Sequence, residues 1–336
     1  MKVGIAGAGV LGRLLAWRLA RSGHRVSVID PAPGPMREGS SSAGFTAAGL
    51  LSPIAELDCG EPRVAELGWR SLQLWPRWLD ELQRPVHYRR DGSWLLAHAG
   101  DLGTAARLLA RLEAHAPEHR PEAVSPQALQ AHEPVLARGL MAWQLKGEGQ
   151  IHTVQALEAL ADAGREAGVD WRWGRLAGQV GPGQIDGEGF DLVFDVRGLG
   201  AKPVLPLRGV RGELLWLHAP GVLLKRPVRV LHPRHRVYLV PRPGDLIVVG
   251  ASEIESEDLS PVSVRSMLEL LSAAHSVLPA LAEARVVRSE TNLRPALPNN
   301  LPLLQREPGL MRINGLFRHG WLAGPALVEQ AMEGLS

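Results

Sequence analysis

The first 30 residues alternate between apolar and polar stretches in an order that predicts strand, turn, helix and strand. Residues 3–6 form a short apolar run, which is typical of a buried strand. Apolar positions at helical spacing predict a helix over residues 13–21, and residues 25–29 read as a second strand that ends at Asp30. This opening predicts a βαβ unit within a parallel sheet.

The remainder of the chain continues this alternation and then becomes rich in strand patterns. Helices are predicted over residues 62–82, 102–115, 126–132, 154–167 and 263–272. Strands are predicted as a pair within residues 88–98 around the turn Asp91-Gly92, and then over residues 169–173, 190–195, 237–240 and 246–249.

The order of these elements predicts an α/β fold with a discontinuous, Rossmann-like nucleotide-binding domain. A second, mainly antiparallel β-sheet domain for the substrate is inserted into it. The nucleotide-binding domain is assigned residues 1–82, 145–209 and 290–336, and the substrate-binding domain residues 83–144 and 210–289. An NAD dehydrogenase would place its nucleotide domain in one run of sequence, so the interruption favours FAD.

The turn between the first strand and the first helix carries the pattern Gly-x-Gly-x-x-Gly. Gly7 permits a tight turn, Gly9 lets a pyrophosphate approach the backbone, and Gly12 lets the helix pack against the strand. The phosphates would then face the positive N-terminus of the helix. Asp30 stands where an acid can accept hydrogen bonds from a ribose. These residues predict dinucleotide binding and, taken alone, leave NAD and FAD open.

Composition narrows the function further. The 336 residues are 45% hydrophobic and 21% charged, with a net charge of +2 and no Lys/Arg block, so a nucleic-acid partner is not predicted.

The single cysteine, Cys59, excludes an internal disulfide and fits a reducing compartment, and no apolar stretch is long enough for a membrane span. We therefore expect a cytoplasmic protein without stable membrane insertion. No metal site is expected, because His232, His235 and His319 lack acidic or cysteine partners at ligand spacing.

Three further stretches suggest binding chemistry. Residues 39–53 are rich in Gly, Ser and Ala, which fits either a flexible linker or a backbone lying close against a flat cofactor; the apolar run at 47–51 favours the cofactor. Arg294, which precedes a proline, offers a planar guanidinium group for a carboxylate ligand, or alternatively for a salt bridge to Glu290 or another acid. Residues 313–325 predict a strand, a glycine turn and a helix with Pro325 at its start.

Seven stretches, in this order along nearly the whole chain, resemble the FAD-dependent D-amino-acid oxidase family, in the branch of glycine oxidases of thiamine biosynthesis. They are the nucleotide motif, residues 47–53 with Glu56, and residues 208–213, 237–242, 248–253, 293–295 and 315–325. The resemblance implies an FAD cofactor. Related sarcosine oxidases attach their flavin to a cysteine near the C-terminal end, whereas Cys59 lies far upstream, so the implied FAD is bound non-covalently.

The resemblance also implies which residues bind. The residues that would contact the adenosine diphosphate half of FAD are Gly7, Gly9, Val10, Leu11, Gly12 and Asp30, with Ala177 near the adenine. The ribityl and flavin portion would lie against Ala43, Gly44, Ala48, Gly49 and Leu50. The residues under the flavin would be Leu316, Phe317, Arg318, His319, Gly320, Trp321 and Leu322. Those at the substrate would be Arg294, Tyr238 and Arg318. The family usually has a histidine where this chain has Leu316.

The implied reaction is oxidative deamination of glycine or another small amino acid, such as sarcosine or a D-amino acid. A hydride would pass to flavin N5, oxygen would be reduced to hydrogen peroxide, and the imine would give an oxo acid and ammonia or serve thiamine thiazole synthesis. The alternative is a related dehydrogenase with another electron acceptor. A relative in which FAD is only structural is disfavoured by the presence of Arg294 and Tyr238. No side chain is assigned as acid or base, and homo-oligomer formation is left open.

Overall fold

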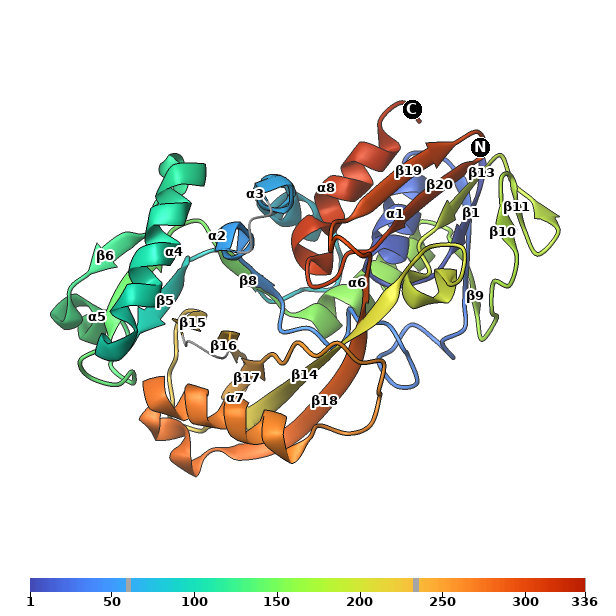
Figure 1. Ribbon diagram of the computed structural model, residues 1–336. Helices are drawn as coiled ribbons and strands as arrows, with labels where there is room; N and C mark the ends of the chain where they lie inside the picture. The colour runs from blue at the N-terminus through green and yellow to red at the C-terminus, as the bar shows by residue number, and fades with distance from the viewer. Residues whose placement is uncertain (59–61, 232–235, 336) are drawn as a thin grey trace.

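The computed structural model describes residues 1–58, 62–231 and 236–335. One part of the fold is a six-stranded sheet in the order β19-β20-β13-β1-β2-β9 (Figure 1). Its strands are β1 (Lys2–Ala6), β2 (Arg25–Asp30), β9 (Asp170–Trp173), β13 (Leu192–Asp195), β19 (Leu303–Glu307) and β20 (Leu310–Asn314). All pairs are parallel except β19 with β20. The sheet draws its strands from three separate parts of the chain, which confirms the predicted α/β fold.

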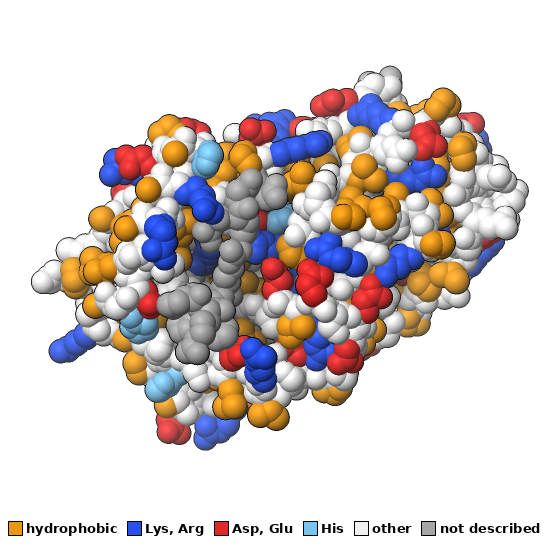
Figure 2. Space-filling model, viewed as in Figure 1, with side chains coloured by type: hydrophobic (Ala, Val, Ile, Leu, Met, Phe, Trp, Pro, Cys, Tyr) orange, Lys and Arg blue, Asp and Glu red, His pale blue; other side chains and the backbone are white. Residues whose placement is uncertain are grey.

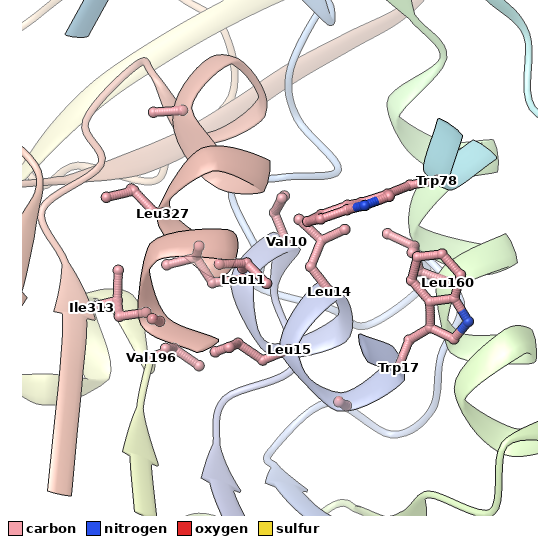
Figure 3. Packing of buried hydrophobic residues seen from close by; sticks show 14 of the residues in the cluster. Val10, Leu11, Leu14, Leu15, Trp17, Trp78, Leu160, Val196, Ile313 and Leu327 are labelled. Atoms are coloured by element: carbon pink, nitrogen blue, oxygen red, sulfur yellow. The ribbon is translucent and has the colours of Figure 1, made fainter. Parts of the chain in front are cut away.

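A group of four helices packs beside this sheet: α1 (Val10–Arg21), α3 (Pro62–Leu79), α6 (Thr153–Glu166) and α8 (Gly320–Met332). The apolar positions of α1 recur at helical spacing, so they form a buried stripe. In this core Leu15 lies toward Ile313, while Trp17 lies toward Trp78 and Leu160 (Figure 3). The two indole rings meet edge to face, with their centroids 6.3 Å apart. This packing fixes α1, and with it the glycine turn at its start.

The second part of the fold is an eight-stranded sheet in the order β18-β14-β17-β16-β15-β5-β7-β6. Its strands are β5 (Ser93–Ala97), β6 (Glu122–Val124), β7 (Met141–Leu145), β14 (Arg208–His218), β15 (Val228–Leu231), β16 (Arg236–Arg242), β17 (Leu246–Gly250) and β18 (Arg285–Ala296). Every pair is antiparallel except β15 with β5. Helix α7 (Val264–Val277) contributes buried leucine and alanine side chains to the core on one face of this sheet.

The remaining helices and strands lie between these elements along the chain. The helices are α2 (Pro53–Asp58), α4 (Leu102–His115) and α5 (Pro126–His132), with 3₁₀ turns at Ala99–Asp101, Pro117–His119, Gly198–Ala201 and Pro279–Glu283. The strands are β3 (Leu50–Leu51), β8 (Gly149–Ile151) and β4 (Tyr88–Arg89) in one small sheet, and β10 (Val180–Gly181), β11 (Gln184–Ile185) and β12 (Glu188–Gly189) in another. None of the helices described is long and apolar enough to cross a lipid bilayer.

Two expectations from the sequence are wrong in detail. The strands within residues 88–98 form, but they do not pair with each other: β4 joins β8 in the small sheet, whereas β5 joins β7 and β15. Between them Gly92, at a φ of +82°, donates its N–H to the carbonyl of Glu148 at 3.1 Å, so the turn is tied to a third segment. The assigned boundaries of the two domains stay a prediction.

The second difference is the position of Pro325 in the last helix. Pro325 lies inside α8 and does not begin it, since the helix starts at Gly320. A proline has no N–H to donate to the carbonyl four residues earlier, here that of Trp321. The indole Nε1 of Trp75 donates to that carbonyl instead, at 3.1 Å. This replacement bond explains how the helix continues through the proline.

Candidate functional site

The glycine turn has the geometry that a pyrophosphate needs. Gly7 directly follows β1 and has a φ of +104°, and a Cβ built on Gly12 would lie 1.8 Å from the carbonyl oxygen of Gly7. Gly9 is the N-cap of α1 and makes no side-chain capping bond, so the first N–H groups of the helix are not capped by a side chain. A Cβ on Gly9 would meet only Ser42 Oγ, at 3.3 Å. The turn therefore fits the diphosphate of FAD.

Asp30 ends β2 next to this turn. Its carboxylate accepts the N–H of Ala8 at 2.6 Å and that of Ala32 at 2.8 Å. Each carboxylate oxygen has a second lone pair, so the group can still accept from a ribose hydroxyl. Asp30 also pairs with Trp173 in the sheet, beside the loop that leads to the buried Ala177. The structure thus brings these residues of the predicted adenosine end to one edge of the six-stranded sheet.

The small-residue segment that follows is built into the fold and is not a solvated linker. Ala48 is 3% exposed, and a Cβ on Gly49 would lie 2.0 Å from the carbonyl of Ile151. The buried guanidinium of Arg242 donates to the carbonyls of Ala48 and Ile151. The carbonyl of Gly44 accepts the indole N–H of Trp321 at 3.0 Å. Such close backbone packing suits a wall against a flat ring system.

A cavity of about 1030 Å³ lies where this segment meets the eight-stranded sheet. Of the predicted site residues it is lined by Ala48, Gly49, Leu50, Tyr238, Arg294, Arg318, Trp321 and Leu322. Other predicted residues lie behind this lining: Gly44 packs against Val10, and Leu316 and Phe317 are buried. Over the face of the molecule drawn in Figure 2, basic and acidic side chains are interspersed.

Arg294 projects from β18 across the neighbouring strand. A Cβ built on Gly212 would lie 2.4 Å from the guanidinium carbon, so the group rests directly on that glycine. Both terminal nitrogens donate to the carbonyl of Ser252 at 3.1 Å, and burial lowers the pKa of Arg294. No described carboxylate forms an ion pair with it. The alternative partner, Glu290, is instead paired with Arg37.

Tyr238 of β16 lies beside Arg294 on the cavity wall. Its ring rests on Gly250, where a Cβ would lie 2.9 Å from the hydroxyl oxygen. Burial raises the pKa of the Tyr238 phenol, despite the opposing charges of Arg294 and Arg318. The hydroxyl therefore keeps its proton and can donate a hydrogen bond into the cavity.

A buried acid holds the third predicted substrate residue. Glu56 of α2 is 7% exposed and accepts from Arg318 Nε at 3.2 Å and Nη2 at 3.0 Å, while His319 Nδ1 lies 3.1 Å from the same carboxylate. Burial would raise the pKa of Glu56, but the charges and hydrogen bonds of His319 and Arg318 outweigh it and lower the pKa to about 2. Glu253 lies 3.5 Å from Arg318 on its exposed side.

This role of Glu56 is not apparent from the sequence, where the residue is only one position of a matching segment. The turn that carries Arg318 is also unusual, because Phe317 has a φ of +49° and donates its N–H to the carbonyl of Pro295 at 2.8 Å. That bond joins the turn to the strand of Arg294. Glu56 and Pro295 together set the position of the turn before α8.

Among the described residues, no group of three or more His, Cys, Asp or Glu side chains is placed to hold a metal ion. Cys59, His232 and His235 lie outside the described residues. Arg197, after β13, pairs with Asp195 at 2.8 Å and donates to the carbonyl of Ala177 at 2.8 Å.

Known proteins share both the sequence and this architecture. The model of the DAO family, FAD dependent oxidoreductase, matches residues 2–331. A Rhizobium etli protein assigned to thiamine biosynthesis as the oxidoreductase ThiO is 39% identical over 332 residues, which cover 98% of this chain and 95% of that protein. The crystal structure of glycine oxidase from Geobacillus kaustophilus is similar with a TM-score of 0.86 and 25% identity, over 99% of this chain and 93% of that one.

The crystal structure of iminodiacetate oxidase from Chelativorans sp. BNC1 is similar with a TM-score of 0.81 and 25% identity, over 98% of this chain and 93% of that one. The family match spans nearly the whole chain, and the glycine turn and Asp30 have the geometry that the cofactor requires. The chain belongs to the FAD-dependent oxidoreductase family and is a glycine oxidase-like enzyme of it.

Proposed function

We propose that this enzyme oxidises glycine or another small amino acid, such as sarcosine or a D-amino acid, with non-covalently bound FAD and oxygen. The observation that carries the proposal is the Arg294 guanidinium, which lines the cavity without a carboxylate partner among the described residues. A buried cation without a counter-charge is costly, and the carboxylate of an amino acid would offset that cost. The name of the Geobacillus kaustophilus protein supports glycine as the first substrate to test.

The cofactor would lie along the residues that fit it. The glycine turn and Asp30 would hold the adenosine diphosphate, and residues 43–50 and 316–322 would surround the ribityl chain and the ring. Bound FAD supplies an acceptor for a hydride at N5 and a route for the electrons to oxygen, giving hydrogen peroxide.

The side chains of this enzyme would act mainly by positioning the substrate. Arg294 can form two parallel hydrogen bonds to a carboxylate, and the protonated hydroxyl of Tyr238 can donate a third. Arg318, held by Glu56, would limit the cavity on the opposite side of the substrate. Fixing one end of a small amino acid in this way orients its α-carbon, and such orientation supplies much of the rate. The proton released from the amine can pass to water, so no side chain is assigned as a base.

The product of this oxidation is an imine. It would hydrolyse to an oxo acid and ammonia, or be consumed in thiamine thiazole synthesis. The assignment of the Rhizobium etli relative to thiamine biosynthesis supports this second fate.

The test is an absorbance spectrum of the purified protein with glycine in the absence of oxygen. We expect flavin bands that bleach with glycine and not with ethylamine, which lacks the carboxylate, and that recover with peroxide release when air is admitted. Acid precipitation should release the flavin into the supernatant if it is bound non-covalently. Bleaching without peroxide would favour a dehydrogenase. A protein without flavin that takes up no added FAD would refute the proposal.

A further inference from the structure

A second arginine shares the cavity wall with Arg294 and Tyr238. Arg229 of β15 is the register partner of Tyr238 in β16, and Tyr238 is the partner of Gly250 in β17. Residues paired across strands project from the same face of a sheet. Arg229 accordingly lines the same cavity as the other two side chains.

Among the residues that the structure describes, Arg229 has no counter-ion. Each of the four glutamates that line the cavity pairs with an arginine: Glu56 and Glu253 with Arg318, Glu255 with Arg208, and Glu269 with Arg265. Arg229 makes no hydrogen bond or ion pair with any residue that the structure describes. Arg107 and Arg111 of α4 add further positive charge to the same lining.

The charge of Arg229 acts on the carboxyl group of Glu148, which already has hydrogen-bond partners. Glu148 accepts hydrogen bonds from the hydroxyl groups of Ser52 and Ser93, each at 2.5 Å. Burial raises the pKa of Glu148, and the charge of Arg229 only partly opposes this rise. The two side chains do not form an ion pair. Arg229 is therefore available to a ligand in the cavity.

The spacing along the sheet limits the size of that ligand. Arg294 rests on Gly212 of β14, and two strands, β17 and β16, separate β14 from β15. Three steps at the usual strand spacing put the backbone of β15 roughly 14 Å from that of β14. The long side chain of Arg229 can cover several ångströms of that distance, so a ligand that bridges the two guanidinium groups is a short molecule with an acid group at each end.

We propose that Arg229 binds a second anionic group of the substrate, so that the enzyme prefers amino acids with an additional carboxylate, on the side chain or on the nitrogen, over neutral ones. This inference rests on the proposed amino-acid oxidation. Arg294 would hold the α-carboxylate beside Tyr238, and Arg229 would hold the second acid at the other end of the cavity. The two guanidinium groups would then select for the distance between the acids as well as for their charge.

Two pairs of amino acids test the charge at nearly constant size: D-glutamate against D-glutamine, and N-(carboxymethyl)glycine against its monoamide. Peroxide release by the holoenzyme gives kcat/KM for each compound. We expect the acid to exceed its amide by about tenfold or more in at least one pair, as for a charge-assisted hydrogen bond. Arg229→Gln should reduce that ratio at least tenfold, whereas Arg265→Gln, which alters an arginine already paired with Glu269, should preserve it.

A preference for neither acid, or a ratio unchanged in Arg229→Gln, would overturn the inference. Using a ratio removes any loss of activity common to both compounds, so a merely structural role of Arg229 would leave it unmoved. Bleaching of the flavin by glycine serves as the separate readout for the proposed function. If glycine bleaches the flavin while both acid-to-amide ratios stay near one, only the second anion site fails.

Discussion

Replacing Glu56 by Gln should destabilise the protein substantially, although the change is nearly isosteric. In the fold His319 and Arg318 overcome the effect of burial and lower the pKa of Glu56 from 4.5 to about 2. A difference of this size means that the fold favours the ionised carboxylate over the protonated one by about 3 kcal/mol. Gln reproduces the uncharged form, so the free energy of unfolding at pH 7 should fall by about 3 kcal/mol.

The assay is urea unfolding followed by tryptophan fluorescence, with the same excess of FAD for every variant because ligand binding adds to stability. Glu253→Gln is the matched control, since Glu253 also faces Arg318 but its side chain is 48% exposed. An exposed pair contributes about 0–1 kcal/mol, so this control should stay close to the wild type.

The pH dependence supplies a second check. The pKa of Glu56 is lower in the fold than in the unfolded chain, so its contribution is complete above pH 4.5 and is lost as the pH falls toward 2. The difference between wild type and Glu56→Gln should therefore shrink over that range. A variant as stable as the control at pH 7, or a difference that does not change with pH, would refute the electrostatic account of this cluster.

Four other changes have defined outcomes. Arg294→Lys keeps the charge but loses the planar fork, so KM for the substrate should rise about tenfold to a hundredfold in steady-state kinetics. Asp30→Ala removes the acceptor of Ala8 N–H and should weaken FAD binding by about tenfold in fluorescence titration of the apoprotein. Gly12→Ala should abolish FAD retention, measured as the flavin-to-protein ratio, whereas Gly34→Ala, with no atom within 4 Å of the added Cβ, should not. Because the fold raises the pKa of Glu148, ionisation of this carboxyl lowers the stability above pH 4.5. Glu148→Gln should therefore unfold at the same or a higher urea concentration than the wild type at pH 7, and should show no increase in stability below pH 4.5.

The parts of the site that could be predicted from the sequence depend on neighbours in the chain. The glycine turn follows from a strand, three glycines and a helix in direct succession, and the structure reproduces it with Gly7 at a positive φ. Helix α6 and the hairpin of β16 and β17 likewise follow from local periodicity and turn residues. Short-range patterns of this kind specify φ, ψ and burial without knowledge of the rest of the fold.

The contacts that define the cavity depend on the pairing of distant segments. Glu56 meets Arg318 across more than 260 residues, and nothing near either residue in the sequence indicates their ion pair. The strands β4 and β5 show the same limit, because their local pattern predicts a hairpin while their partners lie elsewhere. Arg229 could be placed beside Tyr238 only once the register of β15 and β16 was known.

Two glycines show most clearly why that register matters for function. Gly212 lies inside β14 and Gly250 is the last residue of β17. A glycine within a strand usually weakens it. In the structure each leaves a space above the sheet, and a long side chain from the next strand occupies it: the guanidinium of Arg294 above Gly212 and the phenol of Tyr238 above Gly250. A larger residue at either position would displace a proposed substrate-binding group. The two glycines therefore make room for two polar groups that lie against the sheet. Tyr238 is in turn the register partner of Arg229 on β15, so the same face carries a guanidinium group on either side of the phenol. This arrangement is the reason to expect recognition of an acid at each end of the cavity.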